Sequence, residues 1–179
     1  TLFLDFGKQT ILPGIEDEAY MMFDMAFHNS IFKDGAFQLW NPYFFNGLPA
    51  VAHPFYHSFN PIMTIPVLIM GPLDGFKMGI CLSFIMGALG MWFMSVTLGW
   101  RPLTRTWMAL MFAFAGQPVA RFFQGQYDFV MGFGFLAWSL AGLFGLVRTR
   151  RRLYGAVTAL ALAWLFFCGN TYYAYFMMF

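Results

Sequence analysis

Charged side chains are scarce in this sequence. Of its 179 residues only 10% are Asp, Glu, Lys or Arg, whereas 60% are hydrophobic and 22% are aromatic. Soluble domains carry about 25% charged residues, so a soluble fold of this length could not hide so much apolar surface from water. The composition therefore excludes an ordinary soluble domain and predicts an integral membrane protein that has membrane lipids among its partners.

Cysteine is also rare. The two cysteines, Cys81 and Cys168, both fall inside apolar runs, where cysteine behaves as a small buried hydrophobe. They provide no disulfide framework. The sequence also lacks a glycine-rich loop that could cradle a phosphate and an arrangement typical of a Ser-His-Asp triad. The candidates for chemistry are therefore sought among the acids, the histidines and the polar loops.

The later part of the chain, residues 76–179, holds long apolar runs separated by short polar loops. A helix needs roughly 20 apolar residues to span a bilayer, so we predict a bundle of about four spans. They are expected at Phe76–Leu98, Leu103–Val119, Phe129–Val147 and Leu153–Cys168. Because the chain begins at Thr1 and stops inside an apolar run at Phe179, we interpret it as part of a longer membrane protein.

Residues 1–75 are more polar and are expected to form a large loop on one side of the membrane. The segment from Glu16 to Lys33 has no Gly or Pro, which favours an amphipathic helix lying in the membrane interface. The segment from Trp40 to Pro61 has four prolines and is typical of an irregular, ordered loop. The predicted fold class is therefore all-α: a polytopic transmembrane helical protein with interfacial helices in its first outer loop.

The loops between the predicted spans differ in charge. Arg101 and Arg105 lie in one loop and Arg148 and residues 150–152 in another, and neither loop contains an acid. Short loops rich in Lys and Arg stay in the cytoplasm. The acidic first loop is therefore predicted to be extracytoplasmic, on the outer face of a bacterial inner membrane or in a lumen. We interpret the arginines as a topology signal and an anionic-lipid contact, not as a nucleic-acid surface.

Three adjacent acids, Glu16, Asp17 and Glu18, precede the predicted interfacial helix. Acids are favoured at a helix N-terminus by the helix dipole, which is one explanation. The other is catalytic, because a carboxylate that is partly desolvated at a membrane surface gains proton affinity and can accept a proton from a hydroxyl. The residues alone leave both explanations open.

Two polar segments could bind a ligand. The run Trp40-Asn41-Pro42-Tyr43-Phe44-Phe45-Asn46-Gly47-Leu48-Pro49 fits either plain turn chemistry or a rigid loop that offers aromatic faces to sugar rings. A second segment places Arg121, Gln126 and Asp128 in one short turn. Arginine there could hold the phosphate of a lipid-linked donor or simply reach the lipid headgroups.

The three histidines form a weak metal signal. His53 and His57 are four residues apart and His28 precedes them, but a zinc site needs three or four ligands in one place. Because Pro54 interrupts the pair, hydrogen-bonded loop histidines are the favoured interpretation. We predict no cofactor and no metal site, and leave a divalent ion open.

The order of these motifs resembles a known family. Asp17-Glu18-Ala19-Tyr20, then the Trp40–Pro49 run, then Phe55-Tyr56 and Asn60-Pro61, is similar to the first outer loop of GT-C glycosyltransferases, specifically the bacterial YfhO-like group. The resemblance implies a membrane-embedded enzyme that transfers a sugar from a polyprenyl-phosphate donor at the extracytoplasmic face. It implies a catalytic carboxylate at Asp17, with Glu18 beside it.

The substrate-binding residues expected beside these carboxylates are Trp40, Asn41, Asn46, His53, Arg121 and Gln126. One alternative is a non-catalytic membrane subunit that packs against other subunits of a larger complex. A transporter is the weaker alternative, because transporters place ionisable groups at mid-membrane and the predicted spans are expected to contain none.

Overall fold

The computed structural model describes residues 17–43, 46–51, 53, 56–168 and 171–178. Helices make up most of this part of the chain, as predicted. They are α1 Asp17–Phe32, α2 Pro61–Met70, α3 Pro72–Thr97, α4 Pro102–Ala113, α5 Gly116–Gln124, α6 Tyr127–Thr149, α7 Arg152–Phe167 and α8 Thr171–Met178. A two-residue ladder, in which β1 Trp40–Asn41 pairs antiparallel with β2 Leu48–Pro49, is the one strand pairing among the described residues.

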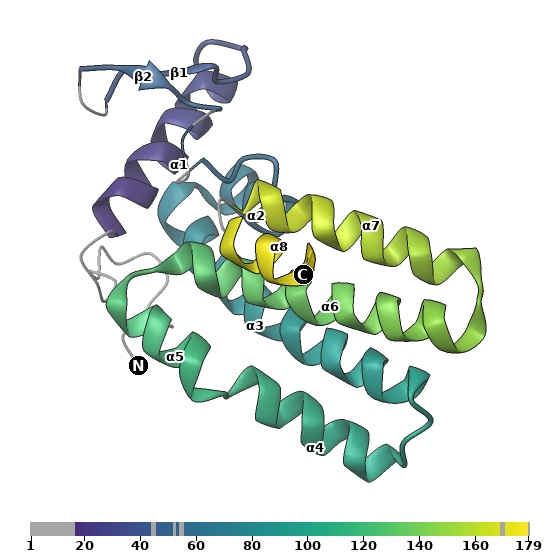
Figure 1. The fold of residues 1–179 in the computed structure, drawn as a ribbon. Coiled ribbons are helices and arrows are strands. Elements are labelled where there is room, and N and C mark those ends of the chain that lie inside the picture. The colour runs from purple at the N-terminus through teal and green to yellow at the C-terminus, as the bar shows by residue number, and fades with distance from the viewer. Residues whose placement is uncertain (1–16, 44–45, 52, 54–55, 169–170, 179) are drawn as a thin grey trace.

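Two of the helices are long and apolar enough to cross a membrane. α3 has 26 residues and α6 has 23, and an 18-residue stretch of each has a mean hydropathy of 1.8 and 1.9, respectively. At about 1.5 Å per residue they measure roughly 39 and 35 Å, more than the hydrocarbon core of about 30 Å. They pack against each other, with α7 beside α6 and α4 beside α3 (Figure 1). They coincide with two of the four predicted spans.

The predicted span from Leu103 to Val119 is broken in the structure. α4 ends at Ala113, Ala115 adopts an extended conformation, and α5 begins at Gly116. Pro118 explains the break, because it has no N–H to donate to the carbonyl of residue 114 and its ring would clash with that turn. The chain therefore starts a new helix, in whose first turn proline is tolerated. α7 is a single helix of 16 residues, roughly 24 Å long, and is shorter than the core.

Small residues let the long helices approach closely. A Cβ added at Gly90 of α3 would come within 2.8 Å of the Ala137 Cβ of α6. One added at Gly142 of α6 would come within 2.8 Å of the Thr158 backbone nitrogen of α7. Close contacts between small residues are typical of helix pairs in membranes.

Helix α1 packs across one end of this bundle. Its buried residues include Tyr20, Phe23, Asp24 and Phe27, which share one helical face because they are spaced three and four residues apart. Its outward face carries apolar side chains such as Met25, which is 51% exposed. Helix α1 therefore has the Asp24 carboxylate on its buried face and Met25 on its outward face.

The two ends of the bundle differ in charge. The α3–α4 and α6–α7 connections lie together at one end, where Arg148 Nη1 donates to the Thr97 carbonyl oxygen at 2.8 Å. The α5–α6 turn and α1 lie at the opposite end (Figure 1). The arginines of both basic connections are thus far from the acids of α1.

Candidate functional site

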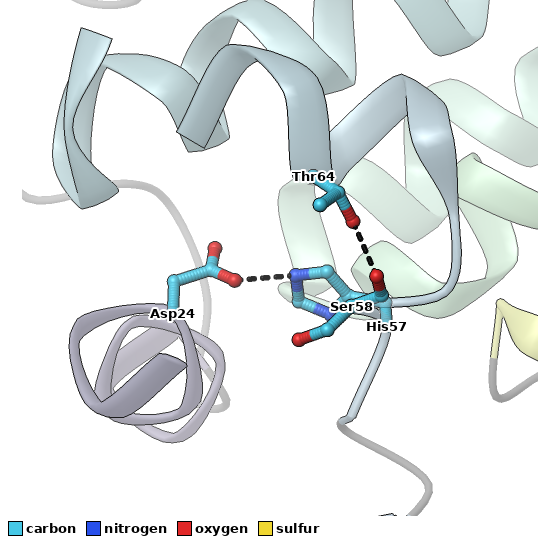
Figure 2. Close-up of polar contacts among 4 residues, drawn as sticks. All are labelled: Asp24, His57, Ser58 and Thr64. Carbon is cyan, nitrogen blue, oxygen red and sulfur yellow. Dashed lines mark hydrogen bonds and ion pairs between the residues drawn. The ribbon is translucent and has the colours of Figure 1, made fainter. Parts of the chain in front are cut away.

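A buried contact between two titratable side chains joins α1 to the turn before α2. The Nε2 atom of His57 lies 2.8 Å from the Oδ1 atom of Asp24, and the two side chains are only 2% and 3% exposed. Figure 2 shows the carboxylate facing the imidazole ring from the neighbouring helix. The contact is an ion pair when the imidazole is protonated.

Each member of this pair has a second polar atom that is unused. Asp24 Oδ2 and His57 Nδ1 are buried, and neither has a hydrogen-bond partner within the described residues. Taking a carboxylate out of water is costly unless it is paired and hydrogen-bonded. The contact between Asp24 and His57 therefore provides the compensation that keeps this carboxylate buried.

Backbone and side-chain hydrogen bonds fix the turn that carries His57. The Asn60 N–H donates to the His57 carbonyl at 2.8 Å, and the Thr64 hydroxyl donates to the Ser58 carbonyl at 2.6 Å (Figure 2). Asn60 Oδ1 accepts from the Ile62 N–H and so caps α2. Asn60 Nδ2 donates to Cys168 Sγ at 3.2 Å, which ties the turn to the end of α7.

A second polar contact joins α1 to the start of α6. The Tyr20 hydroxyl donates to Asp128 Oδ1 at 3.1 Å and accepts from the Asp128 N–H at 3.3 Å. The carboxylate lies in the first turn of α6, where the helix dipole favours a negative charge. The Tyr20 ring packs edge-on against Tyr127 at 5.5 Å and lies 6.0 Å from the His57 ring.

Arg121 and Gln126, both predicted to bind substrate, lie together in the α5–α6 turn. Arg121 Nη1 donates to Gln126 Oε1. The guanidinium carbon also lies 4.6 Å above the centre of the Phe129 ring, a cation–π contact. The half-buried Arg121 side chain therefore has a hydrogen-bonded and an aromatic partner in this structure.

The predicted catalytic acids are the first two residues of α1, Asp17 and Glu18, but their side chains lie outside the described part of the structure. Tyr20 is three residues after Asp17, so the Asp17 backbone lies about one helical turn from it. The Tyr20–Asp128 hydrogen bond therefore brings the start of α1 to the turn that carries Arg121.

The other predicted binding residues lie elsewhere. Trp40, Asn41 and Asn46 belong to the β1–β2 segment at the C-terminal end of α1, away from the α5–α6 turn (Figure 1). α1 has 16 residues and is roughly 24 Å long, so this segment and the start of α1 are separated. Asn41 is fully buried and its Oδ1 accepts from the Tyr43 N–H at 2.9 Å, which is the turn chemistry considered above.

The three histidines have different neighbours. His53 is partly buried and stacks on Phe23 at 4.7 Å, and this burial lowers its pKa. His28 lies 4.5 Å from the Phe32 ring, whereas His57 contacts Asp24. Within the described residues no three His, Cys, Asp or Glu side chains gather as they would around a metal ion.

Two features were missed in the sequence. The sequence did not single out Asp24, and its contact with His57 joins residues far apart in the chain. The usable signal was the position of Asp24 on the same helical face as Tyr20 and Phe23. The expectation that the spans hold no ionisable group is wrong, because α3 contains Lys77, whose side chain is fully buried.

No family model matches the chain, and neither a curated protein nor a solved structure does. The resemblance to GT-C enzymes therefore remains a prediction that rests on the sequence motifs.

Proposed function

We propose that this chain is a membrane-embedded glycosyltransferase, or a part of one, of the GT-C type that resembles the YfhO-like group. It transfers a sugar from a polyprenyl-phosphate donor at the extracytoplasmic face of a bacterial inner membrane. The observation that carries the proposal is the Tyr20–Asp128 hydrogen bond, which holds the first turn of α1, with its two acids, against the turn that contains Arg121.

The proposed step uses both elements. The acceptor hydroxyl oxygen attacks the anomeric carbon of the donor sugar, and its proton passes to the Asp17 carboxylate. The bond between the anomeric carbon and the phosphate oxygen breaks, and the lipid phosphate leaves with that electron pair. The Arg121 guanidinium, released from Gln126, binds the phosphate and stabilises its charge. Glu18 follows Asp17 in α1, and neighbouring helical residues are about 100° apart around the helix axis, so the proposal gives the role of base to Asp17 alone.

A specific observation favours the alternative of a non-catalytic membrane subunit. Asp128 is engaged by Tyr20, and Arg121 by Gln126 and Phe129. Polar groups that satisfy one another in this way also serve to hold helices together. The two proposals differ in whether the α1 acids are needed for turnover.

The deciding experiment replaces Asp17 by asparagine in the full-length protein. The amide keeps the size of the side chain but cannot accept a proton, so transfer from a radiolabelled lipid-phosphate sugar in membranes should fall about 10²–10⁴-fold. Glu18→Gln should cost less. Asp34→Asn, which removes an exposed charge just past the C-terminal end of α1, is the matched control. Wild-type turnover by Asp17→Asn at equal expression would contradict the transferase proposal and favour a non-catalytic membrane subunit.

A further inference from the structure

An apolar groove runs between α3, α6 and α7. Its volume is about 200 Å³, and its walls include Met86, Phe135, Trp138, Val157, Leu160 and Trp164. The Trp138 indole N–H donates to the Met86 carbonyl at 3.0 Å, so this side chain offers only its apolar ring to the groove. The groove opens to the outside past Leu160, which is 52% exposed. Its chemistry suits a hydrocarbon chain.

The basic end of the bundle lies beyond one end of this groove. Arg150, Arg151 and Arg152 are exposed in the connection between α6 and α7. The sequence has no Asp or Glu after Asp128, so no acid in the remaining chain offsets their charge. α7 begins at Arg152, and the N–H groups of a helix start favour an anion as well. Charge complementarity therefore points to a phosphate-bearing headgroup.

The spacing between the arginines and the groove matches one leaflet of a bilayer. Val157 and Trp164 follow Arg152 by five and twelve residues, which places them roughly 8 and 18 Å along the α7 axis. The hydrocarbon of one leaflet is about 15 Å thick. Leu153, 72% exposed, lies on the same helical stripe as Val157 and Trp164. A continuous apolar strip thus leads from the arginines into the groove.

We propose that α6 and α7 form a binding site for one anionic phospholipid, with its phosphate on Arg151 and Arg152 and one acyl chain in the groove. The proposal requires that the bundle lies in a membrane, but it does not depend on the transferase activity. The acyl chain fits because the groove offers apolar walls at the depth of the acyl carbon atoms. The headgroup is selected because the same end of α7 carries uncompensated positive charge.

Quenching by brominated lipids tests the occupant of the groove. The full chain would be reconstituted with Trp164 as its single tryptophan, the others being phenylalanine, and compared with a variant that keeps only Trp107, an exposed residue of α4. We expect acyl-brominated phosphatidylglycerol to quench Trp164 at a lower mole fraction than brominated phosphatidylcholine does. Trp107, which faces bulk lipid in this arrangement, should respond equally to both.

The alternatives give different results. Equal quenching of Trp164 by both lipids would overturn the headgroup selection. Quenching of Trp107 without quenching of Trp164 would mean that protein, either a further helix or a second copy, fills the groove, and would also overturn the proposal. Absence of quenching at both positions would show that the chain is not inserted, which contradicts the membrane placement on which this site and the proposed function both rest.

A charge variant of the otherwise unmodified chain supplies a second test. Arg151→Gln with Arg152→Gln should lower the preference for phosphatidylglycerol about 30-fold, since each arginine near a membrane surface contributes about fivefold. The readout is the ratio of the two lipids that remain bound in native mass spectrometry. Lys33→Gln removes an exposed charge at the other end of the molecule and should leave the ratio unchanged. Equal ratios for both variants would refute the site.

Discussion

Replacing Asp24 by alanine should destabilise the protein strongly, because it leaves His57 buried without its carboxylate. The two side chains are 2% and 3% exposed and their nearest polar atoms are 2.8 Å apart. Removing one member of a buried ion pair typically costs 3–5 kcal/mol. Asp24→Asn keeps the size of the side chain and loses only the charge, so its cost should be nearer the 1–3 kcal/mol of an unsatisfied polar group.

The double variant separates the interaction from simple burial. If the contact is energetically important, Asp24→Ala combined with His57→Ala should cost less than the sum of the two single substitutions, by about 1 kcal/mol or more. The reason is that each single variant leaves an orphaned polar partner behind, whereas the double variant leaves none. If only packing were lost, the free-energy costs of the two single substitutions would instead be additive.

The assay is reversible unfolding of the purified chain in detergent, followed by circular dichroism. Asp34→Ala is the control, because Asp34 is an exposed acid close to the end of α1 and surface substitutions usually change stability by less than about 0.5 kcal/mol. Additivity of the two single variants within about 0.5 kcal/mol, or an Asp24→Ala cost no greater than that of Asp34→Ala, would refute the reasoning.

Two further predictions concern the bundle. Gly142→Ala should cost about 1–3 kcal/mol in the same unfolding assay, since its Cβ would come within 2.8 Å of the Thr158 nitrogen; Gly155→Ala, whose Cβ would meet nothing closer than 3.7 Å, should not. An impermeant thiol reagent should label Asp34→Cys and spare Arg150→Cys in intact cells, in a chain whose own cysteines are replaced by serine. Equal labelling at both positions contradicts the proposed orientation.

The positions of apolar runs and the absence of Gly and Pro were enough to predict several of the helices. The helix predicted from Glu16 to Lys33 is α1, Asp17–Phe32, and two predicted spans coincide with α3 and α6. The break between α4 and α5 was not predicted. A run of apolar residues indicates burial or contact with lipid, but it does not show whether the helix is continuous. Pro118 was the local signal, since proline interrupts the backbone hydrogen bonds of a helix that would otherwise continue.

Sequence motifs predicted one part of the candidate site and not another. Arg121 and Gln126 lie five residues apart on either side of a turn, so their proximity follows from local geometry. The pairing of Asp24 with His57 depends on how α1 packs against the turn before α2, and no periodicity carries that information. Trp40 and Asn46 were grouped with the acids by their order in a motif, whereas the length of α1 separates the two regions.

The two polar contacts of α1 act on the same element from different directions. Tyr20 bonds to the start of α6, and Asp24, one turn later on the same helical face, contacts the turn that leads into α2. A helix held at one point can rotate about its axis, but a helix held at two points by contacts with different elements cannot do so without breaking one of them. The first turn of α1 is therefore fixed in rotation as well as in position. The Asp17 backbone, three positions before Tyr20, is held together with this turn, and a fixed backbone at that position is what the proposed role of Asp17 as the base requires.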